Sequence, residues 1–391
     1  MTTNLAFIIT ESFTFHFYLE KWIIPLSYTY NIHIIGNFSD VEIANLVKKF
    51  SMYSITFHTI DIQRKISWKS DFLSIFRIRK KILKFENLIL FSLMPKANFL
   101  TSLCILFTRR IKFSPIVTGP IWLNYPTTSI KYYFFRMVEG FIFWMADIVI
   151  FDSPSQKKLA LKTSLTPVNR SKFKSTMSFG GIDIDALSLC NEKKILFRKS
   201  IQASPDKKIV MHFSRLCARK GTLEFLKMAD CVIKKLKDDS PIFCIFGPVE
   251  EKAILKSIIS FKQKHGDKIV FKDGVFTNID ELLNGSDILV VPSRWEGFGL
   301  IPAMAAATGT PSVGFNVIGL QDSIRHGVTG YLANPYDVDE LAEYVILLLK
   351  NDIKYSEISI SAQNYAKSFF STDIFLTDFK NLCIELSLIN K

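Results

Sequence analysis

Short apolar, β-branched segments alternate with longer amphipathic segments through the second half of the chain, and this alternation limits the folds open to it. Segments of the first kind predict strands and those of the second kind predict helices. The expected strands are Lys208–Ser214, Ile242–Phe246, Ile269–Lys272, Ile288–Pro292, Ser312–Phe315 and Tyr331–Leu332. The expected helices are residues 221–237, 249–265, 278–285, 299–308, 320–326 and 337–350. This order predicts a parallel, doubly wound sheet.

The first half fits a similar sheet, with strands expected at Leu5–Thr10, Ile32–Gly36, Ser54–Ile60, Asn87–Phe91, Ile116–Thr118 and Asp147–Phe151. We therefore expect two Rossmann-like domains, residues 1–185 and 186–370, joined by a linker near residues 183–205. A C-terminal helix at about residues 371–391 is able to pack back on the first domain. Ligands of open parallel sheets bind at the carboxyl ends of the strands, so a site in a cleft between the domains is expected.

The composition is that of a globular, reduced protein. Hydrophobic residues make up 48% of the chain and charged residues 22%, which excludes disordered and fibrous classes. The six cysteines form no C-x-x-C pair and have no histidine at metal-ligand spacing, so no structural zinc is expected. The first twenty residues have no Lys or Arg before their apolar stretch and include Glu11 and Glu20, which argues against a secretory signal and for a cytoplasmic location.

Positive charge is concentrated in the first half of the chain. Of the net charge of +13, residues 1–185 carry +11, with 23 Lys and Arg against 12 Asp and Glu, and residues 186–391 carry +2. Much of the excess lies in residues 62–84, where eight cations alternate with Ile, Phe and Trp. Such a stretch suits a nucleic-acid backbone, an anionic membrane surface or a solvated helix face.

Two apolar stretches are too interrupted to span a bilayer. Residues 87–108 contain Pro95 and Lys96, and residues 132–151 contain three charged residues, whereas a spanning helix needs about 20 residues with almost no charge. We expect both to be buried helix and strand units, in preference to an aromatic-rich surface that touches a membrane interface.

Two loop segments carry the candidate chemistry. In MHFSRLCARKG (211–221), Arg215 and Lys220 lie between a strand and the start of a helix, where side-chain cations and unpaired backbone N–H groups favour an anion such as a diphosphate. In residues 289–313, a buried strand leads into a loop with Gly297, Gly299 and Glu296, and a helix follows. A carboxylate beside a phosphate site suits a ligand with both hydroxyls and phosphate, as in a nucleotide sugar.

These motifs resemble those of retaining family-4 glycosyltransferases of the GT-B fold (glycosyl transferases group 1), of the bacterial surface-polysaccharide type. The fold that this implies is α/β, with two Rossmann-like domains facing each other across a cleft. The resemblance covers roughly residues 145–350 and rests on PSRWEGFGL…GTP, HFSRLCARKG, ADIVIFDSPSQKK (146–158), GGIDIDAL (180–187) and GLQDSIRHGVTGYL (319–332). Several motifs in the correct order are more specific than any one alone.

The resemblance also implies site residues. It places Arg215 and Lys220 on the donor diphosphate and Glu296 on hydroxyls of the transferred sugar. The sugar and phosphate would further contact the backbone N–H groups of Phe298, Gly299 and Leu300. The base would lie by the main-chain atoms of Gly274, Val275 and Phe276.

Three positions depart from the family pattern. Met304 stands where the family has a second Glu for the ribose hydroxyls, residues 10–16 (TESFTFH) lack the glycine-rich loop, and Gly119 stands where a His is common. We expect an active enzyme, because the two cations and Glu296 are kept; a catalytically impaired relative is the alternative. Asp183 and Asp185 have the D-x-D spacing of metal sites, but one such pair among 36 acidic residues is close to chance, and no metal is assigned.

The expected function is that of a retaining hexosyltransferase. It would move a sugar from a UDP- or GDP-sugar to a glycan acceptor, lipid-linked, in the synthesis of a surface polysaccharide such as O-antigen (lipopolysaccharide) or capsule. The first domain would bind the acceptor, peripherally on the anionic inner face of the cytoplasmic membrane. The alternatives are an impaired glycosyltransferase-like partner protein and a basic nucleic-acid-binding protein; no nucleic-acid motif supports the latter.

Overall fold

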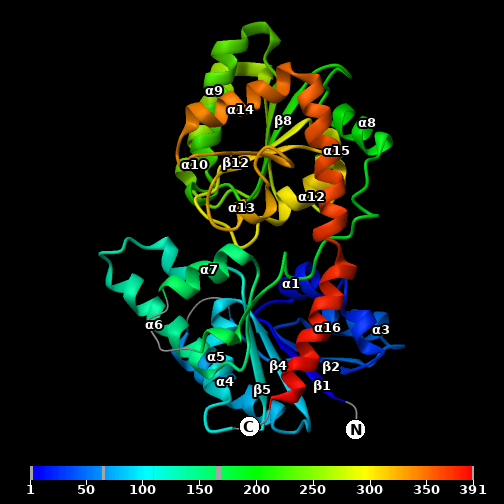
Figure 1. The fold of residues 1–391 in the computed structure, drawn as a ribbon, viewed down its shortest axis with the longest axis vertical. Coiled ribbons are helices and arrows are strands. Elements are labelled where there is room, and N and C mark those ends of the chain that lie inside the picture. Colours follow the sequence, from blue (N-terminus) through cyan, green and yellow to red (C-terminus); the bar gives the residue numbers. More distant parts are fainter. Residues whose placement is uncertain (1–2, 64–66, 109, 164–168, 390–391) are drawn as a thin grey trace. The chain divides into compact units, whose positions relative to one another are not determined.

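The computed structural model describes residues 3–63, 67–108, 110–163 and 169–389, and it divides the chain into two compact units (Figure 1). Unit 1 comprises Met1–Gly181 and Thr372–Lys391, and unit 2 comprises Ile182–Ser371. The division therefore falls at residue 181, four residues before the position expected from the sequence. The last helix belongs to unit 1.

Within the described residues, unit 1 contains a seven-stranded parallel sheet in the order β3-β2-β1-β4-β5-β6-β7. All six residues of β4 are buried, as expected for a parallel strand that helices cover on both faces. The strand β7 was not predicted, because three residues are too few to show the apolar pattern of a strand. The strands are β1 (Asn4–Ile8), β2 (Asn31–Gly36), β3 (Ile55–Thr59), β4 (Leu88–Leu93), β5 (Lys112–Val117), β6 (Val149–Phe151) and β7 (Phe173–Ser175).

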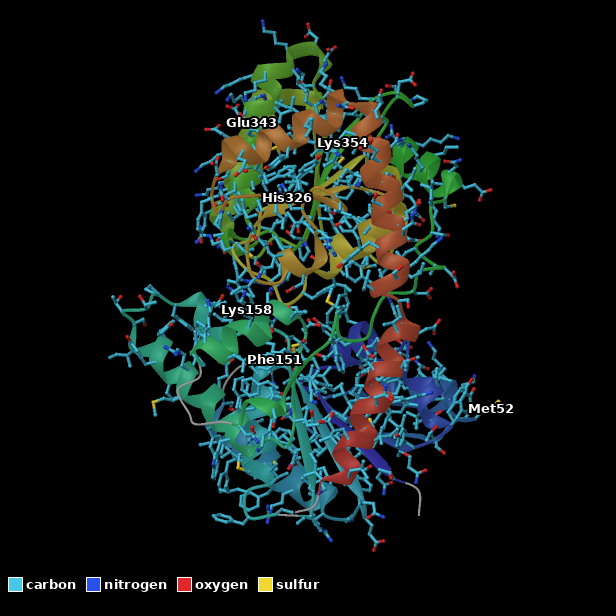
Figure 2. All side chains as sticks on the ribbon, viewed as in Figure 1. Met52, Phe151, Lys158, His326, Glu343 and Lys354 are labelled. Carbon is cyan, nitrogen blue, oxygen red and sulfur yellow. The ribbon has the colours of Figure 1, made fainter. Side chains whose placement is uncertain are left out.

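Helices cover both faces of this sheet and enclose two apolar clusters, one on each face. Figure 2 shows Phe151 among the buried side chains of unit 1 and Met52 projecting from its surface. One face is covered by α4 (Trp68–Ile82), α5 (Pro95–Cys104), α6 (Ile130–Met145) and α7 (Pro154–Thr163). The other is covered by α1 (Ser12–Thr14), the π-helix Phe15–Leu19, α2 (Ile23–Ser27), α3 (Asp40–Lys49) and α16 (Thr372–Leu388); the short 3-10 helices of unit 1 are Ile121–Asn124 and Arg170–Lys172.

The C-terminal helix α16 is part of the core of unit 1. Its buried residues Phe375, Phe379 and Leu386 recur at helical spacing and face the sheet. The ring of Phe379 lies 5.2 Å from Trp22 and 4.9 Å from Phe91 between centroids. Aromatic contacts of this kind add to the hydrophobic stabilisation and fix where the helix lies on the sheet.

The two apolar stretches of unit 1 have different outcomes. Residues 87–108 form buried β4 and α5, as predicted. The prediction of burial is wrong for one face of α6, where Tyr133, Phe134, Met137 and Trp144 are each more than half exposed. The helix has only one face to bury against the sheet, so its remaining apolar residues stay in solvent. No helix in the described ranges is long and apolar enough to cross a membrane.

Unit 2, within the described residues, contains a six-stranded parallel sheet in the order β10-β9-β8-β11-β12-β13. Each strand overlaps one expected from the sequence. The strands are β8 (Ile209–Phe213), β9 (Ile242–Gly247), β10 (Ile269–Asp273), β11 (Ile288–Val291), β12 (Ser312–Phe315) and β13 (Gly330–Ala333).

The helices of unit 2 follow the expected positions, except that the sequence analysis predicted neither α8 (Asn191–Ser200) nor α15 (Asp352–Phe369). The region that the sequence analysis treated as linker contains α8 (Asn191–Ser200), which packs on α11 and pairs Arg198 with Asp287 at 2.7 Å in the interior. The others are α9 (Thr222–Leu236), α10 (Lys252–His265), α11 (Ile279–Gly285), α12 (Leu300–Thr308), α13 (Leu320–Ser323), α14 (Val338–Lys350) and α15 (Asp352–Phe369), with 3-10 turns at Ala218–Lys220, Lys237–Asp239 and Gly266–Lys268.

A glycine fixes the closest approach within unit 2. Gly221 precedes α9 with φ of +75°, and a Cβ atom placed on it would lie 1.8 Å from the carbonyl oxygen of Pro292. The loop that follows β8 therefore rests directly on the end of β11. Only glycine permits both this backbone conformation and this contact.

We predict that Gly221→Ala lowers the free energy of unfolding by about 2–5 kcal/mol, since a left-handed alanine and a steric overlap both cost stability. Urea unfolding monitored by circular dichroism measures the loss. The matched control is Gly327→Ala, where φ is also +75° but nothing lies within 4 Å of the added Cβ, so about 1–2 kcal/mol is expected. Equal losses in the two variants would contradict the role of the Pro292 contact.

Candidate functional site

The sheet order of unit 2 brings two loops that are distant in sequence to the same place. β8 and β11 are neighbours, and the chain proceeds from them in opposite directions across the sheet. Such a switch point leaves a crevice at the carboxyl ends of the two strands, and ligands of open α/β sheets bind there. The loop after β8 (residues 214–221) and the loop after β11 (residues 292–299) both begin at this edge.

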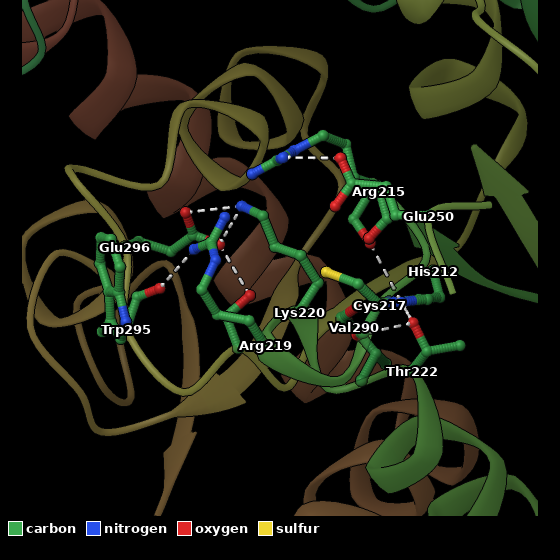
Figure 3. Close-up of polar contacts among 12 residues, drawn as sticks. His212, Arg215, Cys217, Arg219, Lys220, Thr222, Glu250, Val290, Trp295 and Glu296 are labelled. Carbon is green, nitrogen blue, oxygen red and sulfur yellow. Dashed lines mark hydrogen bonds and ion pairs between the residues drawn. The ribbon is translucent and has the colours of Figure 1, made fainter. Parts of the chain in front are cut away.

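A buried histidine ties the two strands and the next helix together (Figure 3). The Nδ1 atom of His212 lies 3.1 Å from the carbonyl oxygen of Val290, and Nε2 lies 3.3 Å from the hydroxyl of Thr222 and 3.2 Å from that of Ser214. Only a proton on Nδ1 satisfies the carbonyl, so Nε2 accepts from the hydroxyls. Burial lowers the pKa of His212 to about 4, so the ring is a neutral strut at pH 7.

Lys220 and Glu296, assigned to different parts of a ligand by the sequence motifs, form an ion pair at this switch point. The ammonium Nζ of Lys220 lies 2.6 and 2.7 Å from the two carboxylate oxygens of Glu296, and the hydroxyl of Ser293 donates to the same carboxylate at 2.7 Å. The side chains are only 16% and 12% exposed. One cation and one anion are thus held ready at the end of two buried strands.

The Glu296 carboxyl is kept ionised by its neighbours. Burial alone would raise its pKa, but the charge and hydrogen bonds of Lys220 act against burial, helped by Ser293 and by the charge of Arg219, and the pKa of Glu296 lies below its ordinary value. A carboxylate accepts hydrogen bonds and donates none. It is therefore able to bind the hydroxyls of a ligand.

Arg219 is a third cation of the site, which the sequence analysis did not single out. Its guanidinium lies 4.7 Å from the ring centroid of Trp295 and donates to the Trp295 carbonyl at 3.4 Å. The backbone carbonyl of Arg219 accepts from the N–H of Arg294 at 3.0 Å. In the sequence, Arg219 adjoins Lys220 and Trp295 adjoins Glu296, which were the signals that could have found it. Only the strand order shows that the segment with Arg219 meets the segment with Trp295.

Arg215 pairs with a different carboxylate from Lys220. Its guanidinium pairs with the carboxylate of Glu250 at 2.7 Å, and both side chains are well exposed, at 42% and 39%. Figure 3 marks this contact and the contacts of Lys220 with Glu296 by separate dashed lines. An ion pair this exposed contributes about 0–1 kcal/mol, so another anion is able to replace Glu250.

Backbone donors lie at the start of α12. Gly299 is the N-cap with φ of +86°, and the ring of Phe298 is buried 5.2 Å from Phe370. No hydrogen bond within the described part of unit 2 uses the N–H groups of Phe298, Gly299 or Leu300. The partial positive charge of the helix end favours an anion at this place.

The other candidate residues lie around this edge. Val275 is exposed just beyond β10, with Gly274 before it, and the ring of Phe276 stacks 5.3 Å from Phe246. Met304 is 6% exposed on α12 and packs in the apolar interior. Its thioether offers no hydrogen-bonding group comparable to the carboxylate that the resemblance implies at this position.

Asp183 and Asp185 of the D-x-D motif lie at a turn. A carboxylate oxygen of Asp183 accepts from the N–H of Ala186 at 3.0 Å and so closes a turn. Among the residues that the structure describes, no group of three or more His, Cys, Asp or Glu side chains is placed to hold a metal ion.

In unit 1, helical turns follow β1, where the sequence lacks the glycine-rich loop that the resemblance implies. His16, which lies in them, contacts Glu20 at 2.6 Å and Glu42 at 3.4 Å. Farther along the sheet, beyond Gly119, the carboxylate of Glu139 accepts from the indole Nε1 of Trp122 at 2.6 Å beside a small cavity. Burial raises the pKa of Glu139 to about 7, although Trp122 and Arg136 act in the opposite direction.

We predict that Glu139→Gln increases the free energy of unfolding relative to the parent as the pH rises from about 5 to about 8. Up to about pH 7 the folded parent keeps a proton that the unfolded chain, with a pKa of 4.5, has largely released. The stability of the parent therefore falls as the pH rises. The gap between variant and parent should widen by about 1–3 kcal/mol. Urea unfolding at both pH values measures this, and a constant gap would refute a carboxyl that titrates near neutrality.

The known proteins that this chain resembles include several glycosyltransferases. The model of the family "Glycosyl transferases group 1" matches residues 193–365, which lie in unit 2. The capsular polysaccharide biosynthesis glycosyltransferase CapM of Staphylococcus aureus is 23% identical over 327 residues, which is 83% of this chain and 84% of CapM. The poly(ribitol-phosphate) alpha-N-acetylglucosaminyltransferase of Staphylococcus aureus (strain COL) is 28% identical over 176 residues, 45% of this chain and 35% of that protein.

Solved structures match both units. HepE of Anabaena in complex with UDP and glucose has a TM-score of 0.79 at 16% identity, over 98% of this chain and all of HepE. A glycosyltransferase from Rickettsia africae ESF-5 has a TM-score of 0.75 at 18% identity, over the full length of both chains. These likenesses, the two parallel sheets and the match over unit 2 lead to one conclusion. The chain has the two-domain GT-B fold, and residues 193–365 resemble the glycosyl transferases group 1 family.

Proposed function

We propose that this chain transfers a sugar from a nucleotide-sugar donor to a glycan acceptor, with retention of the anomeric configuration. The observation that carries the proposal is the Lys220–Glu296 ion pair at the switch point of the donor-side sheet. A nucleotide sugar offers a diphosphate to the cation and sugar hydroxyls to the carboxylate. Lys220 would then pair with the diphosphate and Glu296 with sugar hydroxyls, in place of their contact with each other.

Arg219, Arg215 and the start of α12 extend the positive side of this site. The diphosphate would take Lys220 from Glu296 and compete with Glu250 for Arg215, while the N–H groups of residues 298–300 donate to a phosphate or to the sugar. Donors that are already in place cost no reorganisation when negative charge develops on the leaving group. Gly274, Val275 and Phe276 would adjoin the base of a UDP- or GDP-sugar.

The transfer step needs no further reactant. The bond between the sugar's anomeric carbon and the diphosphate oxygen breaks, and a bond from the same carbon to the acceptor hydroxyl oxygen forms on the same face. The proton of that hydroxyl goes to the departing diphosphate oxygen. Stabilising the diphosphate is then the main task of the protein, and the cations supply that stabilisation.

The proposed acceptor, a lipid-linked glycan, is inferred from the charge of unit 1 and from the name of a relative. CapM is named for capsular polysaccharide biosynthesis, and a surface polysaccharide built on a lipid-linked acceptor suits the basic residues 1–185. Cations near an anionic membrane contribute about 1 kcal/mol each. We therefore propose peripheral binding at the cytoplasmic face of the membrane, with unit 1 facing the acceptor.

A second candidate is a catalytically impaired partner of another transferase. Met304 in place of a carboxylate and the helical turns after β1 favour it. It predicts nucleotide binding with no transfer and no donor hydrolysis. Screening UDP- and GDP-sugars by thermal shift, followed by a hydrolysis assay with each donor that binds, separates the two candidates.

We predict that Lys220→Met lowers turnover by a factor of about 10²–10³, because a contact to developing charge is lost. In contrast, Glu296→Gln should leave the affinity for the free nucleoside diphosphate unchanged or raise it, since Lys220 loses its competing anion, while turnover still falls. Calorimetric titration and a transfer assay measure the two effects. Equal losses of affinity and turnover in Glu296→Gln would place Glu296 on the nucleotide.

Two further variants control this experiment. Lys220→Met alone leaves a buried, unpaired carboxylate that costs stability, so the double variant Lys220→Met/Glu296→Gln tests binding in a folded protein and should not bind the diphosphate. Lys234→Met removes a cation of α9, the helix that follows the turn carrying Lys220; Lys234 pairs with Asp230 on the surface. It should retain parental affinity and turnover.

We also propose that transfer is independent of metal ions, because three cations and a helix end provide the positive charge that a metal would otherwise supply. Turnover should be the same with and without a chelator such as EDTA. Loss of activity in EDTA that Mg²⁺ or Mn²⁺ restores would overturn this part of the proposal.

A further inference from the structure

Helix α6 of unit 1 exposes a continuous apolar stripe. Ile130, Tyr133, Phe134, Met137 and Trp144 are each more than half exposed and recur at spacings of three, four and seven residues. Phe141, partly exposed, fills the gap in the stripe, 6.2 Å from Trp144 between ring centroids. Single exposed apolar residues are common, but a row of large ones along one helix marks an interaction surface.

Helix α4 exposes a mixed apolar and basic face. Phe72, Leu73 and Phe76 are more than half exposed. They share their face with three exposed cations at helical spacing, Lys69, Arg77 and Lys80, and a fourth exposed cation, Lys84, follows just beyond the end of the helix. Arg79 lies on a different face and donates to the carbonyl of Leu106 at 3.1 Å, so it does not belong to this surface.

The two helices cover the same face of the sheet in unit 1. α5 packs against both α4 and α6, and residues of all three enter one apolar cluster. The ring of Phe99 on α5 lies 6.3 Å from Phe141 on α6. The apolar stripe and the basic face therefore lie on the same side of one rigid sheet.

The charge of unit 1 decides which occupant suits this surface. A second copy of the chain would bring one strongly basic surface against another, and like charges that meet at an interface cost free energy. An anionic bilayer offers the opposite charge to α4 and an apolar interior to α6. Tyr and Trp, both present in the stripe, are the side chains enriched at membrane interfaces.

We infer that the exposed stripe of α6 inserts into the acyl region of an anionic membrane, and that the cations of α4 hold the adjacent headgroups. This inference rests on the proposed peripheral location but goes further, because it assigns insertion to residues outside the basic stretch. Charge attraction is screened over about 8 Å at physiological salt, whereas burial of apolar side chains is not. Binding should thus have a salt-sensitive part from α4 and a salt-resistant part from α6.

The test uses the full-length protein and sedimentation with vesicles of phosphatidylcholine, alone or mixed with phosphatidylglycerol. The variant Phe134→Ser/Met137→Ser should bind the mixed vesicles about tenfold less tightly, equivalent to ~1.4 kcal/mol, and lose the binding that survives high salt. Arg77→Gln/Lys80→Gln should lose mainly the salt-sensitive part. The matched control is Val41→Ser/Val47→Ser, two exposed apolar residues of α3 on the opposite face of the sheet, which should bind as the parent does.

Trp144 provides an independent measure of depth. Lipids brominated on the acyl chains should quench the tryptophan fluorescence of the parent, and Trp144→Phe should remove most of that quenching. If the α6 variant binds as the parent does, or if Trp144→Phe is quenched equally, insertion by α6 is refuted while charge-driven peripheral binding stands. If the parent binds no vesicles and the α6 variant abolishes a dimer seen by analytical ultracentrifugation, the stripe is a contact between copies and the inference fails.

Nucleotide binding separates this inference from the proposed function. Calorimetric affinity for UDP or GDP depends on unit 2 and should be unchanged in every α4 and α6 variant. Loss of vesicle binding with intact nucleotide affinity supports the inference. A parent that binds neither nucleotide would sink the proposed function, whatever its behaviour toward vesicles.

Discussion

The direct contact between the loop after β8 and the end of β11 is the constraint on which the candidate site depends. Gly221 allows the two to touch, and His212 links β8, β11 and α9 from beneath. With the backbone fixed in this way, Lys220 and Glu296 meet although 76 positions separate them. The ion pair follows from the strand order of the sheet, and the chemistry proposed for the protein follows from the ion pair.

An ion pair of this kind is costly to bury, and its presence therefore indicates a role other than stability. Desolvation penalises both charges, and a well-packed apolar pair would serve stability as well or better. Ser293 and Arg219 reduce the cost by supporting the Glu296 carboxylate. A fold that keeps this arrangement at a switch point has charges available for a ligand that carries both phosphate and hydroxyl groups.

Much of this arrangement could be predicted from the sequence, because alternation of apolar strands and amphipathic helices is a strong local signal. The strands of unit 2 and the segments carrying Lys220 and Glu296 were predicted from residues 208–333. The sequence failed where the determining factor is tertiary. The sequence analysis treated α8 as part of a linker because its packing partners, α11 and Phe246 of β9, are distant in sequence. Arg219 gains its role only from the position of Trp295. The exposure of α6 depends on how much of the helix the sheet can cover. Arg215 was predicted from its motif, but its contact with Glu250 could not be, because 35 positions separate the two residues.

The most direct test of the account is a crystal structure of the protein with a bound nucleotide sugar or its unreactive analogue. The account predicts that a diphosphate oxygen accepts from Nζ of Lys220, that a sugar hydroxyl donates to the Glu296 carboxylate, and that the Lys220–Glu296 contact of 2.6 Å lengthens or breaks. A ligand bound elsewhere, with the ion pair intact and the N–H groups of residues 298–300 still without a ligand, would contradict it.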